Sequence, residues 1–299
     1  RWDAVVVGGG VAGLAAALWL ARYRRSVCVY DSAEPRNEPA WAVHGYPGLV
    51  DPSPTELRRR LYEQAVGAGA VHATRKVLRI SGARDAFRVE PADVEPIEAR
   101  RVILAYGLID RLPDIPGVER FYGTSVFHCP DCDGPEVQNC SIGVVGWDRH
   151  AAALALYLQT WTQDVVLLAH GHTIEVNDSA RAVLADAGID IRPERLQGVD
   201  GNGARLMHVN VANGNVIELD ALFFHLGTHP RADLAEQLAC GYDDDGYVAV
   251  DRGQETTVAG VHAAGDITGH PHLAVTAAAA GVHAALSIHR SLLPDARRV

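Results

Sequence analysis

The sequence predicts an α/β protein built from two doubly wound, three-layer domains, the first of which is discontinuous along the chain. The pattern over residues 4–30 predicts a strand, a glycine-rich turn, a helix and a second strand, which is how such a domain opens. A similar strand-turn-helix-strand pattern begins again at Ser141. The chain closes with a strand, the pair Gly265-Asp266 and a long alanine-rich helix, which we expect to complete the first domain.

The elements of the first domain follow from apolar runs and the residues that bound them. They are a strand at Ala4–Val7, a helix at Val11–Tyr23, a strand at Ser26–Tyr30, a helix at Pro54–Ala68 and a strand at Ala99–Ala105. Ser53 is the expected N-cap of the second helix, and Glu56, three residues later, is its expected capping-box partner.

A second series of elements follows from Ser141. It comprises a strand at Ser141–Gly146, a helix at Ala151–Leu158, strands at Asp164–Leu168, Ala221–Leu226 and Val258–Ala264, and a helix from about His272 to His289. Pro113, Pro116 and Gly117 form a turn-rich stretch suited to a domain crossing, and His229-Pro230 marks the return. We therefore predict a first domain of residues 1–113 and 229–299, with residues 114–228 inserted as the second.

Composition places the chain among ordinary globular proteins. Of its 299 residues, 48% are hydrophobic and 21% are charged, and the formal charge is −10 with a pI near 5.7. An acidic surface argues against nucleic acid or an anionic membrane as a partner. Residues 4–21 carry no charge, but four glycines interrupt them, so we expect no spanning or targeting segment and a cytoplasmic location. Five cysteines are too few for a secreted fold held together by disulfides.

The turn after the first predicted strand carries a glycine pattern that suits a dinucleotide. Gly8-Gly9-Gly10-Val11-Ala12-Gly13 is a G-x-G-x-x-G between a strand and a helix. Its glycines allow a tight turn, close approach of a pyrophosphate and close packing of helix on strand. Asp31 follows 18 residues after Gly13, where a carboxylate can bind a ribose hydroxyl. The two predicted domains are therefore interpreted as Rossmann-like nucleotide-binding domains.

A second motif, Cys129-Pro130-Asp131-Cys132, predicts a redox-active disulfide. Two thiols in a C-x-x-C can form a small ring disulfide, and a first helical turn lowers the pKa of one of them. Structural zinc is the alternative, but it needs a second pair of ligands and no second C-x-x-C exists. The pairs His170/His172 and His270/His272 have ligand-like spacing without nearby cysteines, so we expect no metal.

The third motif is Gly265-Asp266, placed between a strand and the last helix. A carboxylate at a strand end can accept a hydrogen bond from a hydroxyl group. The N-terminus of the helix that follows can stabilise negative charge developing on a bound ring.

Together these motifs resemble the low-molecular-weight thioredoxin reductase family, the class II pyridine nucleotide-disulfide oxidoreductases, over essentially the whole chain. The resemblance implies a flavoprotein, usually a homodimer, that binds FAD through Gly8, Gly10, Val11, Ala12, Gly13, Asp31, Gly107, Gly265, Asp266 and Ala274. It also implies that Cys132 faces flavin C4a and that Cys129 exchanges with a thioredoxin-like protein or a small dithiol or disulfide. Asp133 would be the general acid/base. Trp41, His44, Tyr46 and Pro47 either line the substrate approach or form a packed turn.

The chain departs from the family where the inserted domain should bind NADPH. The expected Gly-x-Gly-x-x-Ala is Gly146-Trp147-Asp148-Arg149-His150-Ala151, so a carboxylate replaces the middle glycine. Asp148 repels a diphosphate and is a natural N-cap, so we expect it to occupy the helix N–H groups that the phosphates need. The loop of residues 169–173 also lacks the arginines expected for a 2′-phosphate.

From these losses we predict a flavin-dependent thiol–disulfide oxidoreductase that does not use NADPH in the ordinary way. It would act as a dithiol oxidase or as a reductase supplied by another electron donor. Two alternatives stay open. In the first, Arg149 or a remote arginine compensates, and the protein is a conventional NADPH-dependent thioredoxin reductase. In the second, it is a flavin-binding redox sensor without turnover.

Overall fold

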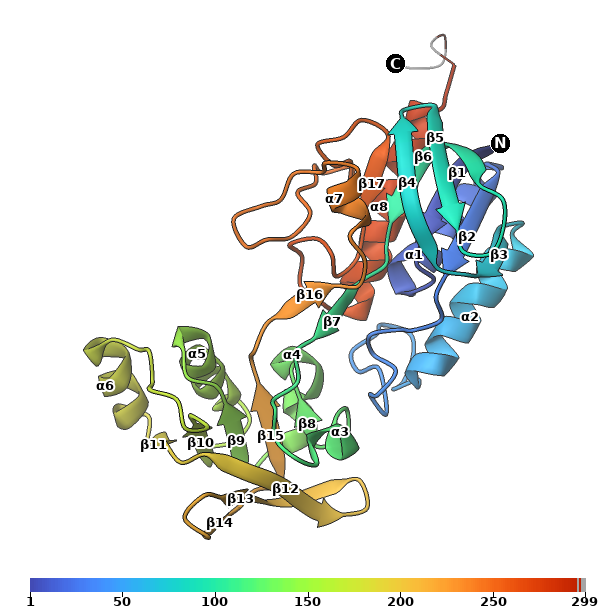
Figure 1. Cartoon of the computed structure of the whole chain (residues 1–299). Helices are drawn as coiled ribbons and strands as arrows, with labels where there is room; N and C mark the ends of the chain where they lie inside the picture. The colour runs from blue at the N-terminus through green and yellow to red at the C-terminus, as the bar shows by residue number, and fades with distance from the viewer. Residues whose placement is uncertain (295, 297–299) are drawn as a thin grey trace. The chain divides into compact units, whose positions relative to one another are not determined.

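The computed structural model describes residues 1–294 and 296, and its contacts divide the chain into two compact units of mixed α/β structure (Figure 1). The first unit contains Arg1–Glu38, Tyr46–Ile109 and His229–Val299; the second contains Pro39–Gly45 and Asp110–Thr228. The short segment 39–45 thus associates with the second unit although its neighbours in sequence belong to the first. None of the helices that the structure describes is both long and apolar enough to cross a membrane.

The first unit is organised around a seven-stranded sheet with the order β3-β2-β1-β6-β5-β4, in which β17 also pairs with β6. Its elements are β1 (Trp2–Val7), α1 (Val11–Arg22), β2 (Val27–Asp31), α2 (Pro54–Gly67), β3 (Val71–Thr74), β4 (Val77–Ala83), β5 (Ala86–Pro91), β6 (Ile97–Leu104), α7 (Leu234–Gln237), β17 (Val261–Ala263) and α8 (Ala274–Ser291). Strands β7 (Leu108–Asp110) and β16 (Thr228–Pro230) form a separate two-stranded sheet where the chain passes from one unit to the other. The central strands β3, β2, β1, β6 and β17 pair in parallel. Their carboxyl ends therefore meet at one edge, where ligands bind in such sheets.

Helices α1 and α8 pack together over one face of this sheet (Figure 1). Small residues make the approach close, because Ala16, Ala284 and Ala285 are fully buried in the shared core. A Cβ added at Gly281 would lie 2.1 Å from the carbonyl oxygen of Ala12, so this position of α8 requires glycine. The N-terminus of α1 is thereby held beside the segment that carries Gly265.

The second unit contains a five-stranded parallel sheet of the order β11-β10-β9-β15-β8 and a three-stranded antiparallel sheet. Its elements are α3 (Val118–Phe121), β8 (Val126–Phe127), α4 (Pro130–Asp133), a 3₁₀ turn (Gly134–Val137), β9 (Ile142–Val145), α5 (Arg149–Leu158), β10 (Val165–Leu168), α6 (Asp178–Asp186), β11 (Asp190–Arg192), β12 (Leu196–Asn202), β13 (Arg205–Val211), β14 (Val216–Glu218) and β15 (Ala221–Phe224). After β9 the chain moves outward to β10 and β11, and β15 then pairs on the other side of β9. Such a reversal of strand order is the place where this architecture forms a ligand crevice.

The structure confirms both strand-turn-helix-strand patterns and corrects one local expectation. Ser53 caps α2, and its hydroxyl accepts a hydrogen bond from the Glu56 N–H at 3.2 Å. The reciprocal half of the capping box is wrong, because the Glu56 carboxylate pairs with Arg59 and Arg60 at 2.8 and 2.6 Å. The turn-rich stretch around Pro116 lies within the second unit, where the Pro116 carbonyl accepts a hydrogen bond from the Val199 N–H.

Candidate functional site

The turn between β1 and α1 forms an open cradle in the first unit. Gly8 has a φ of +111°, and a Cβ there would lie 2.2 Å from the Ala105 carbonyl oxygen. A Cβ at Gly13 would lie 2.0 Å from the Gly8 carbonyl oxygen. A Cβ at Gly10, in contrast, would meet none of the described atoms within 4 Å. Gly10 is the N-cap of α1 and offers no side chain to the helix N–H groups, so they face open space suited to a phosphate.

Asp31, the last residue of β2, supplies an ionised acceptor next to this cradle. The side chain is buried, and a Cβ at Gly9 would lie 2.5 Å from its Oδ2. Burial opposes ionisation, but hydrogen bonds from His72 and Arg58 outweigh it and hold the pKa of the Asp31 carboxyl below its ordinary value. Arg58 also donates from Nε to the Gly9 carbonyl at 3.2 Å. The sequence did not reveal Arg58, which comes from α2.

The third motif lies against the same helix. Gly265 has a φ of +81°, and a Cβ there would lie 2.9 Å from the Ala12 Cβ. Asp266 pairs with Arg36 at 2.8 Å, and the Arg36 guanidinium also lies 3.1 Å from His272 Nδ1. Ala274 is the first residue of α8.

The structure thus brings the glycine turn, Asp31 and Gly265 together, with Val11, Ala12 and Gly13 in the first turn of α1. Gly107, between β6 and β7, directly follows Tyr106, whose Cα would lie 2.9 Å from a Cβ at Gly8, and the Gly107 carbonyl accepts a hydrogen bond from the Arg231 N–H. An open phosphate cradle with acceptors on both sides fits FAD.

In the second unit, Cys129 and Cys132 form a disulfide with a Cα–Cα distance of 5.3 Å. Pro130 begins the four-residue helix α4, and Cys129 is its N-cap. The Cys132 N–H donates to Cys129 Sγ at 3.1 Å, which favours a thiolate at Cys129 when the disulfide opens. Among the described residues, no group of three or more potential ligands is arranged to hold a metal ion.

The ionisable neighbours of the two cysteines each have another partner. His128 lies 3.2 Å from the Tyr122 hydroxyl through Nδ1 and 3.8 Å from Asp110 through Nε2. Asp131 accepts a hydrogen bond of 2.6 Å from the Tyr157 hydroxyl on α5. The sequence did not identify either tyrosine, because both lie outside the C-x-x-C motif.

Asp133 is the titratable group whose environment best suits proton transfer. Burial raises the pKa of its carboxyl to about 6, with His44 lowering and Glu136 raising it. His44 Nδ1 lies 3.7 Å from a Glu136 carboxylate oxygen. His44 belongs to segment 39–45, which is fixed on the second unit by a hydrogen bond from the Trp41 N–H to the Gly123 carbonyl. The sequence identified this aromatic turn but not its link to Asp133.

The turn between β9 and α5 occupies the position in the second unit that the glycine cradle occupies in the first. Here Asp148 is the N-cap, and its Oδ1 accepts hydrogen bonds from the His150 and Ala151 N–H groups at 3.0 and 2.9 Å. This confirms that Asp148 caps the helix. The Trp147 indole stacks on the His172 imidazole, with 3.7 Å between ring centroids and 16° between planes. The helix N–H groups that would meet a diphosphate are therefore already bonded to a carboxylate.

Comparisons with known proteins agree with this architecture. Residues 2–281 match the pyridine nucleotide-disulphide oxidoreductase family. A thioredoxin reductase of Treponema pallidum is 30% identical, over 89% of this chain and 89% of its own. The crystal structure of HlmI superimposes with a TM-score of 0.92 at 34% identity, covering 97% of this chain and 92% of HlmI. An oxidoreductase from Agrobacterium tumefaciens gives 0.90 at 30% identity, covering 98% of both chains.

Proposed function

The chain belongs to the pyridine nucleotide-disulphide oxidoreductase family, and we propose that it exchanges electrons between dithiols and FAD without drawing on NADPH in the ordinary way. Its class is a flavin-dependent oxidoreductase acting on disulfides, with FAD as cofactor. The proposed sites are the first-unit cradle for FAD and Cys129, Cys132 and Asp133 for the sulfur chemistry. A homodimer is a prediction that rests on the resemblance alone, and a cytoplasmic location is a prediction from the sequence.

The bonding of Asp148 carries the proposal. A dinucleotide diphosphate would have to displace that carboxylate from two N–H groups, at a cost of about 1 kcal/mol for the lost cap. The diphosphate would then lie beside the displaced Asp148 carboxylate, and the repulsion between the two negative groups would weaken its binding further. Gly10 imposes neither cost at the first-unit cradle.

The disulfide and its neighbours can oxidise a dithiol in two exchange steps. A substrate thiolate attacks Cys129 Sγ, so a mixed disulfide forms and Cys132 leaves as a thiolate. The second substrate thiol then attacks the mixed disulfide, which releases the substrate as a disulfide and leaves the enzyme with two thiols. Asp133, whose pKa is about 6, can take up and return the protons near neutral pH. Bound at the cradle of Gly8, Gly10 and Gly13, FAD would supply a two-electron acceptor for the reduced Cys129 and Cys132 pair, with molecular oxygen as the proposed final acceptor.

A conventional NADPH-dependent thioredoxin reductase is the second candidate, and one observation favours it. Burial lowers the pKa of His170, and Arg195, which lines the same slot, lowers it further. A remote arginine thus supplies a cation near the loop of residues 169–173, which contains no arginine or lysine of its own. Several relatives carry the name thioredoxin reductase. We therefore propose two kinds of substrate, a thioredoxin-like protein or a small dithiol.

Anaerobic titration of the purified FAD-loaded protein separates the candidates. We expect stoichiometric NADPH to bleach the flavin absorbance slowly and a small dithiol such as dithiothreitol to bleach it fast. Cys129→Ser should abolish the response to the dithiol while leaving the protein yellow. Rapid bleaching by NADPH would refute the proposal, and equal behaviour of wild type and Cys129→Ser towards dithiols would favour a sensor without turnover.

A further inference from the structure

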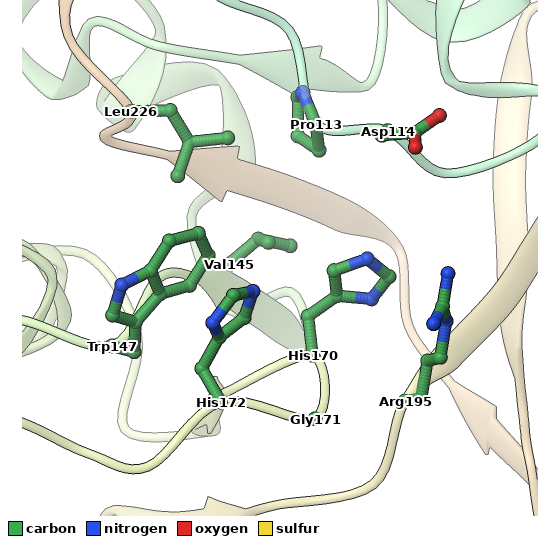
Figure 2. Close-up of a pocket in the computed structure, with 9 residues that line it drawn as sticks. All are labelled: Pro113, Asp114, Val145, Trp147, His170, Gly171, His172, Arg195 and Leu226. Atoms are coloured by element: carbon green, nitrogen blue, oxygen red, sulfur yellow. The ribbon is translucent and has the colours of Figure 1, made fainter.

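A slot of about 350 Å³ opens at the carboxyl edge of the second-unit sheet, where the strand order reverses around β9. Figure 2 shows the His170 and His172 imidazoles on one side of it and Leu226 with Pro113 on the other. Val145, at the end of β9, lies at the back. The slot lies entirely within the second unit, and none of the residues assigned above to FAD or to the disulfide lines it.

The imidazole of His170 offers a hydrogen-bond donor. The Leu196 N–H donates to His170 Nδ1 at 3.1 Å, so the neutral ring carries its proton on Nε2. Burial, Arg195 and His172 lower the pKa of His170, and Asp114 raises it by a smaller amount, so the ring is neutral at pH 7. His170 has a φ of +52°, and this unusual backbone turn is held in place by its surroundings.

Among the described residues that line the slot, Arg195 is the one arginine or lysine and supplies a permanent positive charge. Among the described residues, its guanidinium makes no hydrogen bond or ion pair. The backbone that carries it is tied to the histidine loop by hydrogen bonds from the Ala169 N–H to the Arg192 carbonyl and from the Gly171 N–H to the Pro193 carbonyl, at 2.9 and 3.0 Å. The His170 donor and the backbone that carries Arg195 are therefore positioned before any ligand arrives, which lowers the entropic cost of binding, while the exposed Arg195 side chain can turn towards a ligand.

We propose that this slot binds a small aromatic carboxylate: a flat ring between the imidazoles and Leu226, with its carboxylate on Arg195 and His170. A planar guanidinium suits a carboxylate, and the apolar and aromatic walls suit a ring. Asp114 on the rim opposes a second negative charge, which disfavours phosphates relative to carboxylates. The inference rests on the proposed function in one respect, namely that Asp148 occupies the N–H groups at the start of α5 that a diphosphate would bind.

Isothermal titration calorimetry of the oxidised, FAD-loaded protein tests this, with indole-3-carboxylate, AMP and NADPH as the probes. We expect the carboxylate to bind more tightly than AMP or NADPH. Arg195→Gln should weaken its binding at least tenfold, because a charge-assisted hydrogen-bond pair is lost. Asp114→Asn should strengthen it several-fold. Arg192→Gln is the matched control and should change nothing, because Arg192 pairs with Glu194 at 2.9 Å and does not line the slot.

Three outcomes overturn the inference: no binding of the carboxylate at millimolar concentration, equal affinities in Arg195→Gln and Arg192→Gln, or tighter binding of AMP or NADPH. Thermal unfolding of each variant separates lost binding from lost folding. The proposed function has a different readout, the bleaching of flavin absorbance. If a dithiol bleaches the flavin fast but the carboxylate does not bind, only the inference about the slot is wrong. If NADPH bleaches the flavin fast and the carboxylate binds in an Arg195-dependent way, only the proposed function is wrong.

Discussion

The two units each present a turn between a central strand and a helix, yet only one of these turns is open. In the first unit, Gly10 leaves the start of α1 uncapped, and nothing among the described atoms lies within 4 Å of where its Cβ would be. In the second unit, Asp148 takes the same place before α5 and bonds two N–H groups itself. The comparison teaches that this architecture can keep its strands, helices and switch point while one side chain occupies the helix N–H groups that the other turn leaves open. Fold and ligand are separable here.

Closing the open turn is the most severe test of this comparison. Gly10→Asp gives α1 the cap that α5 has, and the open space around Gly10 accommodates the side chain. We expect FAD affinity to fall by about two orders of magnitude, since the phosphates meet a carboxylate and lose N–H donors. The ratio of flavin to protein absorbance measures this. Gly10→Asn, of equal size without the charge, should lose less FAD, and equal losses would show that charge is not the cause.

Opening the closed turn is the converse test and should have a smaller effect. Asp148→Gly frees the N–H groups of His150 and Ala151 and removes a negative charge. We expect NADPH to bind about tenfold more tightly, while stability changes by only a few tenths of a kcal/mol, as for other cap-to-glycine changes. Calorimetry and thermal melts measure the two effects. An unchanged NADPH affinity would mean that Trp147, not Asp148, blocks the turn.

In the proposed function, the proton chemistry belongs to Asp133 of the second unit, and the pH dependence of the reaction tests that assignment. Asp133 acts as a base only when ionised, so dithiol-driven flavin bleaching should fall as the pH drops through about 6. His44→Gln removes a group that lowers the pKa of Asp133 and should move the midpoint upward. Glu136→Gln removes a group that raises it and should move the midpoint downward. Stopped-flow rates from pH 5 to 8 give these midpoints, and shifts in the same direction would contradict the assignment.

The smallest expected effect concerns the contact between α4 and α5. Tyr157→Phe removes the hydrogen bond to Asp131, an exposed pair whose contribution is small in water. We expect the rate of dithiol exchange to change less than about threefold, since exposed polar pairs contribute little. Pre-steady-state bleaching measures it. A loss comparable to that of Cys129→Ser would mean that Asp131, held by Tyr157, takes part in the chemistry.

The sequence predicted what depends on close neighbours in the chain and missed what depends on distant ones. The glycine turn, the C-x-x-C and the Asp148 cap each lie within a few residues, so spacing alone indicates them. Arg58 beside Asp31, and His44 acting on Asp133 from 89 residues earlier, meet only because the chain folds. The capping box failed for a related reason, because Arg59 and Arg60 compete for the Glu56 carboxylate.

Segment 39–45 limits how this protein can be cut into parts. A fragment spanning residues 110–228 would contain both cysteines and Asp133 but leave His44 behind. Its titration curve would then differ from that of the intact chain even if every strand formed. The fragment would also expose Gly123. In the whole protein the Pro39 carbonyl packs against Gly123, and the Gly123 carbonyl accepts a hydrogen bond from the Trp41 N–H. Any truncation series or chimera of this enzyme should therefore carry the seven-residue piece along, as a tethered or added peptide.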